Sequence, residues 1–155
     1  IALEGVRLIA NHLTQAVSTP TDTNARTQML MASMMGAVAF QKGLGVTHSC
    51  AHALSTVYDM HHGLANALMI EAAMQFNRET KPEAFERLAT AVGAKDFIQW
   101  LKSFKATIGL NKTLKDFQVK VSDALLDVAV KDVCHPSNPR SVTRTDFKML
   151  FEQAV

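Results

Sequence analysis

Apolar residues recur at helical spacing along almost the whole chain, and short polar stretches separate the repeats. From Leu3 to Val17 an apolar residue returns every three or four positions, which predicts a helix that a Ser-Thr-Pro sequence then closes. A second helix is expected from residues 22–24 to about Lys42, and its many methionines are typical of adaptable core packing. Two glycines then break the pattern before a third helical segment that includes residues 48–55.

The second half of the chain carries clear signals for where helices begin and end. Residues 63–76 are apolar on nearly every side, which predicts a central, buried helix. Proline in a first turn, glycine after a last turn and a serine or threonine cap mark the others. They predict helices from Pro82 to Gly93, over residues 97–109, from Ser122 to Val133, and after a Thr143–Asp146 capping box.

Only one stretch, Leu114–Val121, is compatible with a short extended segment. We find no internal repeat, low-complexity segment or linker, and 155 residues suit one domain with a substantial core. The pattern therefore predicts an all-α fold, a multi-helix bundle of seven to eight helices without a sheet of three or more strands.

Composition and charge exclude several classes of function. The net charge is only +2, and the basic residues are spread along the chain, so no nucleic-acid partner is expected. Glu71 interrupts the longest apolar run, which leaves it shorter than the 18 or so residues of a membrane span. The first residues also lack the pattern of a signal peptide, because Glu4 and Arg7 interrupt them. We expect no membrane partner.

Two further features concern the redox compartment of the chain and where the sequence begins. Cys50 and Cys134 form no CxxC pair, which favours free thiols in a reducing cytoplasm over a disulfide. The first residue is Ile1, and a helical pattern starts at once, which suggests a piece of something longer.

Histidines are concentrated in one stretch of the sequence. The chain has six, and His48, His52, His61 and His62 fall within fifteen residues. His48 and His52 are four residues apart, so on a helix they share one face. Imidazole is both the commonest metal ligand and a common proton shuttle, while a histidine on an apolar helix face is also often a core residue bonded to a carbonyl. No Glu follows the first histidine, so a zinc protease of the HExxH type is disfavoured.

The segment GAVAFQKGLGVTHSCAHALSTVYDMHHGLANALM contains a Gly-rich turn, a His-x-x-x-His pair and then a His-Gly helix start. Phe76-Asn77 follows that helix, and Cys134, Asn138, Pro139 and Arg140 lie in the later segment DVCHPSNPRSVTRTDF. In this order, over almost the whole chain, the sequence resembles the C-terminal region of the iron-containing alcohol dehydrogenases. The resemblance implies that residues 1–155 form the C-terminal helical metal-binding domain of a dehydroquinate-synthase-like architecture, and that an N-terminal nucleotide-binding domain is absent from this chain.

The resemblance also implies roles for four residues. His48 and His62 would be two of the metal ligands, His52 the catalytic imidazole that relays the alcohol proton, and Cys134 a residue lining the substrate pocket. The family's other two ligands, an Asp and a His spaced Asp-x-x-x-His, have no counterpart here. The implied cofactors are a divalent metal, Fe2+ with Zn2+ as the alternative, and NAD(P) in the intact enzyme. His61 stands where the family usually has proline and is expected to be exposed rather than a ligand.

The implied function is that of a metal-dependent alcohol dehydrogenase, which transfers hydride between a small alcohol or aldehyde and NAD(P). The isolated chain is expected to be inactive, and the intact enzyme to be a cytoplasmic homodimer. Two other readings stay open: a non-catalytic helical interaction domain derived from that family, and a helical metal-binding protein of hydrolytic type. The second needs another carboxylate ligand, for which Glu71 lies about two turns beyond His62, a poor position.

Overall fold

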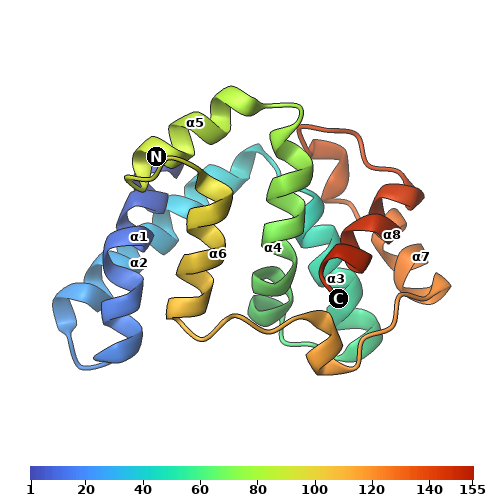
Figure 1. Ribbon diagram of the computed structural model, residues 1–155, viewed down its shortest axis with the longest axis horizontal. Helices are drawn as coiled ribbons and strands as arrows, with labels where there is room; N and C mark the ends of the chain where they lie inside the picture. The colour runs from blue at the N-terminus through green and yellow to red at the C-terminus, as the bar shows by residue number, and fades with distance from the viewer. The chain divides into compact units, whose positions relative to one another are not determined.

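The computed structural model describes all residues from Ile1 to Val155, and every regular element in it is a helix (Figure 1). The all-α prediction is thus confirmed, with eight α-helices. They are α1 (Ala2–Ser18), α2 (Thr23–Ala39), α3 (Val46–Tyr58), α4 (His62–Arg78), α5 (Pro82–Ala91), α6 (Phe97–Thr107), α7 (Asp123–Lys131) and α8 (Arg144–Gln153). Three short 3-10 helices, η1 (Phe40–Lys42), η2 (Leu114–Phe117) and η3 (His135–Ser137), lie between them.

Most helices begin and end at the residues that the caps predicted. Thr143 and Asp146 form the expected capping box at the start of α8, and the Ser122 side chain caps α7. Gly93 and Gly109 follow α5 and α6 with φ angles of 70° and 76°, a left-handed conformation that glycine adopts without a steric penalty.

Two expectations about the chain after residue 110 were wrong. The Leu114–Val121 stretch begins with the 3-10 helix η2 instead of an extended segment, because a Thr113–Asp116 capping box starts a helical turn. Helix α7 ends at Lys131 and does not continue to Val133, because Asp132 has an extended backbone and its side chain bonds to α3.

The structure forms two compact units. The first contains residues Ile1–Lys42 and Pro82–Asn111. In it α1 packs along α2, and Gly5 permits this contact, since an added Cβ would already touch Met35 Cβ at 3.4 Å. Helix α5 packs against both α1 and α6. Stacked rings of Phe97, Trp100 and Phe104 lie along α6.

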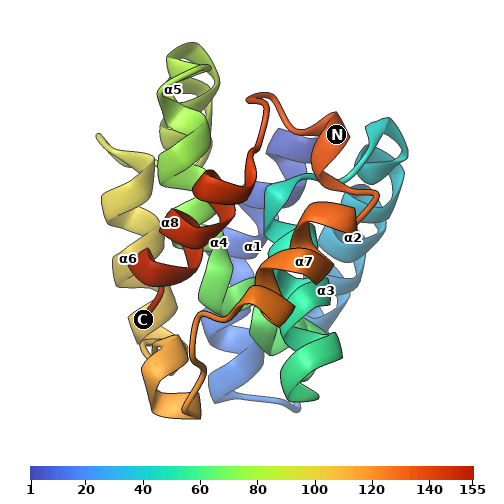
Figure 2. The same cartoon turned by 90° about the vertical axis from the view of Figure 1, so that its right-hand side faces the viewer.

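The second unit contains residues Gly43–Lys81 and Lys112–Val155. Helix α3 packs on α4 and α7, and α8 packs on α4 and α7 (Figure 2). Helix α4 contributes six buried residues to this unit, and no residue from Leu64 to Arg78 is exposed. The largest fully buried side chains of the unit, which form its core, are Phe147, Phe151, Leu54, Met69, Leu114, Leu125 and Leu150. All of the histidines predicted to act in the site belong to this unit.

No single helix is long and apolar enough to cross a membrane. Only the segment Thr23–Lys42 and helix α3, taken together as a broken pair, reach the required length and composition.

Candidate functional site

The N-terminus of helix α3 is capped by a side chain from a distant part of the sequence. Its N-cap residue is Gly45, which offers no side chain to accept the first N–H groups of the helix. Asn138 supplies the missing acceptor, since its Oδ1 accepts a hydrogen bond from the Val46 N–H at 3.2 Å. An added Cβ at Gly45 would lie 2.9 Å from that oxygen, so glycine is required for this approach.

The register of α3 separates a buried face from a histidine face. The buried face carries Val46, Ser49, Cys50, Ala53 and Leu54, which recur at helical spacing. His48 and His52 lie on the other side and are half-buried. Their ring centroids are 6.0 Å apart, as expected for residues one turn apart.

The chain reverses between α3 and α4 and brings a third imidazole to the same place. Asp59 ends α3 with a φ of 50°, and His61 is the extended residue before α4. His62 is the first residue of α4, as predicted, and is exposed. His61 is exposed as well, as expected, and its ring lies close to Gly63.

The three imidazoles converge. The His48 and His62 ring centroids are 5.4 Å apart, and the His52 ring stacks on His62 at 5.2 Å. His48 and His62, which lie on different helices, are thus brought close together by the fold. The three rings thus lie in one place, where ligands of a common metal ion would have to meet.

The environment of His48 favours its neutral form. Burial lowers the pKa of His48, and the neighbouring His62 and His52 lower it further, against a weaker opposing effect of Asp132. The neutral ring is the form that binds a metal ion. Asn66, one turn after His62, approaches that ring with its side-chain nitrogen 3.1 Å from Nε2 and also donates to the His62 carbonyl at 3.0 Å.

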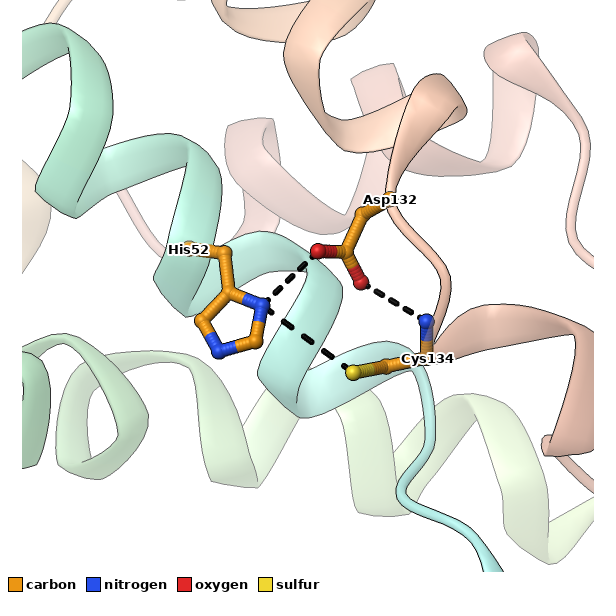
Figure 3. Close-up of side chains that lie close together, drawn as sticks. All are labelled: His52, Asp132 and Cys134. Atoms are coloured by element: carbon orange, nitrogen blue, oxygen red, sulfur yellow. Dashed lines mark hydrogen bonds and ion pairs between the residues drawn. The ribbon is translucent and has the colours of Figure 1, made fainter.

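A second group of side chains surrounds His52 on the side of α7 (Figure 3). Asp132 Oδ2 lies 2.7 Å from His52 Nδ1, and Asp132 Oδ1 accepts hydrogen bonds from Ser49 Oγ at 2.6 Å and from the Cys134 N–H at 2.9 Å. The Cys134 sulfur is 4.0 Å from His52 Nδ1. Burial opposes ionisation of Asp132, but the hydrogen bonds from Ser49, His52 and Cys134 outweigh it and lower the pKa to about 2.

Two groups of donors could therefore hold a metal ion. One is the pair His48 and His62, which would need further ligands, and the other is the group His52, Asp132 and Cys134, whose donor atoms lie within 4.8 Å of one another. In the second group the His52–Asp132 hydrogen bond already occupies Nδ1. Burial and Asp132 also raise the pKa of the Cys134 thiol to about 11, whereas a metal binds the thiolate. The first group is the better candidate, because its nitrogens suit Fe(II) or Zn(II) and the lowered pKa of His48 favours the neutral ring that binds a metal.

Sequence reasoning missed two residues of this site, Asp132 and Ser49. Ser49 is fully buried beside His48, and Asp132 follows α7. The only local signal was an Asp two positions before Cys134, just past a predicted helix, which does not reveal its partner 80 residues earlier. Cys134, which the resemblance singled out, lies beside His52.

Comparison with known proteins identifies the family. The model of the C-terminal part of the Fe-containing alcohol dehydrogenase family matches residues 1–155. The 1,3-propanediol dehydrogenase of Citrobacter freundii is 34% identical over 99% of this chain and 43% of its own length, and the 4-hydroxybutyrate dehydrogenase of Cupriavidus necator is 32% identical over 100% and 44%.

Solved structures agree with the sequence matches. The crystal structure of a 1,3-propanediol oxidoreductase superposes with a TM-score of 0.92 at 32% identity, and an alcohol dehydrogenase from Oenococcus oeni with 0.93 at 30%. Both matches cover 99% of this chain and 44% of the other. The chain spans less than half the length of these relatives. It belongs to the iron-containing alcohol dehydrogenase family and corresponds to the C-terminal portion of its members.

Proposed function

We propose that this chain is the helical, metal-binding part of an NAD(P)-dependent alcohol dehydrogenase that acts on a small primary alcohol or diol, or on the matching aldehyde. The observation that carries the proposal is the convergence of His48, His52 and His62, with ring centroids 5.2–6.0 Å apart, in a chain of this family. The names of three relatives support the substrate class: they are dehydrogenases of 1,3-propanediol, 4-hydroxybutyrate and methanol.

In this proposal His48 and His62 would hold the divalent metal together with ligands from outside the chain. Fe2+ is the proposed ion, and Zn2+ suits the same nitrogens. When bound, the metal acts as a Lewis acid on the alcohol, and NAD(P) accepts the hydride. The chain itself has no strand and so no dinucleotide-binding sheet, and we propose that the relatives' remaining length corresponds to the part that binds NAD(P).

His52 would take the proton that the alcohol loses and pass it to solvent. Its side chain is 37% exposed, and its ring stacks on that of His62 with centroids 5.2 Å apart. A group in this position can exchange protons with water while it faces the reacting hydroxyl. The proposal therefore separates two roles on one helix face: His48 binds the metal and His52 moves a proton.

Cys134 would line the pocket beside His52. Its raised pKa keeps the thiol neutral at pH 7, so it acts as a small, apolar wall next to the imidazole. Both thiols are free, which supports the cytoplasmic location proposed here.

Alanine variants of the three histidines test the proposal in the intact protein. His48→Ala and His62→Ala should lose the metal and all turnover. His52→Ala should retain the metal while kcat falls about 100-fold or more. His61→Ala is the matched control, because His61 is an exposed neighbour of His62, and it should keep both metal and activity.

The measurements are metal content by elemental analysis and steady-state rates with NAD(P) and 1,3-propanediol or methanol. Loss of metal in His52→Ala together with retention of metal and activity in His62→Ala would show that the roles are assigned wrongly. A wild-type intact protein that bound metal but oxidised no alcohol would instead favour a hydrolytic or non-catalytic function.

A further inference from the structure

The carboxylate of Asp132 is the most heavily bonded side chain around His52. Three donors converge on it: the Ser49 hydroxyl and the Cys134 N–H at Oδ1, and the His52 ring at Oδ2. Its side chain is only 12% exposed, and Ser49 is fully buried. The arrangement joins the end of α7 to α3 at the residue that would move the proton (Figure 3).

The Asp132 carboxylate determines which of the two ring nitrogens of a neutral His52 carries the hydrogen. An ionised carboxylate can only accept hydrogen bonds, so the ring nitrogen that faces it must carry the hydrogen. The low pKa of Asp132 keeps it ionised at neutral pH. At a distance of 2.7 Å, Nδ1 is therefore the protonated nitrogen, and Nε2, on the opposite side of the ring, has a free lone pair.

We propose that Asp132 is a positioning residue of the dehydrogenase: it holds His52 in the tautomer with hydrogen on Nδ1, so that Nε2 can accept the proton of the alcohol. This inference rests on the proposed function. It adds a residue that touches neither substrate nor metal and that acts through His52. Ser49 and the Cys134 N–H fix the carboxylate from its other side, so that Oδ2 stays directed at the ring.

The substitution Asp132→Asn tests the inference because it keeps the shape of the side chain but reverses the direction of its hydrogen bond with His52 Nδ1. The Cys134 N–H and the Ser49 hydroxyl both point at the Oδ1 position, so the amide oxygen is expected there. The amide nitrogen then occupies the Oδ2 position and donates to His52 Nδ1. A neutral His52 must then carry its hydrogen on Nε2. That nitrogen has no free lone pair and can no longer accept the proton of the alcohol.

The experiment uses the intact, zinc-loaded protein labelled with ¹⁵N at histidine. Nitrogen spectra report which ring nitrogen carries hydrogen, and loss of signals in a His52→Gln variant assigns them. In the wild type the hydrogen should lie on Nδ1, and in Asp132→Asn on Nε2. Asp132→Asn should lower kcat about 100-fold or more, with KM changed less than about threefold and metal content unchanged.

Asp127→Asn is the matched control. It makes the same chemical change on α7, but Asp127 is 56% exposed and pairs with Arg144 instead of His52. It should change neither the His52 spectrum nor kcat.

Two results would overturn the inference. One is a wild-type spectrum with hydrogen on His52 Nε2, a result that does not depend on the Asp132→Asn variant. The other is an Asp132→Asn protein with an inverted tautomer and unchanged kcat. If the wild type oxidised no alcohol, the proposed function would fail, and the nitrogen spectra would still decide whether Asp132 sets the tautomer.

Discussion

Asn138 and Val46 are joined by a hydrogen bond that spans 92 positions of the chain, from the Val46 N–H to Asn138 Oδ1 at 3.2 Å. The same side-chain oxygen accepts from Asn77 Nδ2 at 3.1 Å. Its nitrogen donates to Asn77 Oδ1 and to the Arg140 carbonyl, both at 2.7 Å. All four hydrogen-bonding positions of the amide are thus used. The start of the histidine-bearing helix is fixed to the end of α4 and to the loop before α8.

Asn138→Ala should destabilise the protein by about 1–3 kcal/mol, because it leaves the N–H of the buried Val46 and the amide of the half-buried Asn77 without these partners. The free energy of unfolding, measured with urea, tests this. Asn111→Ala is the control, since Asn111 is exposed, and its effect should stay within about 0.5 kcal/mol. Equal effects of the two substitutions would contradict the role given to Asn138.

Gly45→Ala and Gly36→Ala should change stability in opposite directions. A Cβ at residue 45 would lie 2.9 Å from Asn138 Oδ1, so it must displace that side chain, at a cost of about 1–3 kcal/mol. A Cβ at residue 36, inside α2, meets nothing within 4 Å, and alanine there should stabilise the protein by about 0.5–1 kcal/mol. Thermal unfolding of both variants provides the measurement, and a stabilising Gly45→Ala would refute the close approach.

Asp132 should make stability depend on pH in the acid range. Its pKa is about 2 in the folded protein against an ordinary 3.8, so the unfolded chain binds this proton at higher pH than the native one. The stabilisation is complete above the ordinary value and is lost as pH falls towards 2. The shift corresponds to roughly 2 kcal/mol.

Urea unfolding between pH 6 and pH 2, with a chelator present, measures this effect. The difference in stability between the wild type and Asp132→Asn should shrink as pH falls below the ordinary value. A difference that stays constant down to pH 2 would show that Asp132 is not held as its hydrogen bonds indicate.

Metal binding should need ligands from outside these 155 residues. With only His48 and His62 as proposed ligands, the isolated chain should bind Zn2+ weakly or not at all near pH 7, because protons compete for the imidazoles. Calorimetric titration of the chain, after circular dichroism has shown that it is helical, makes the measurement. Tight, stoichiometric binding that His62→Ala abolishes would mean that further ligands, such as Asp132, lie within the chain.

The positions of the helices could be predicted from the sequence because the signals that mark them are local. Apolar spacing and caps lie within a few residues of each helix end, as in the Thr143–Asp146 box, and backbone hydrogen bonds of a helix span four residues. The shared face of His48 and His52 follows from the same spacing. Recognition of the family, likewise, needed only the order of motifs along the chain.

The surroundings of His52 were decided by tertiary structure alone. Asp132 reaches His52 across 80 positions and Ser49 across 83, and no periodic pattern relates residues so far apart. The contact forms because α7 packs on α3, and because Asp132 leaves the helix two residues earlier than its apolar pattern suggested. Propensity favoured a longer α7 through Val133, but hydrogen bonds from three donors stabilise the ionised Asp132 in an extended conformation. The sequence by itself determined which helices form and which imidazoles share a face. Only the packing of those helices determined which carboxylate orients the imidazole, because that depends on side chains brought together from distant parts of the chain.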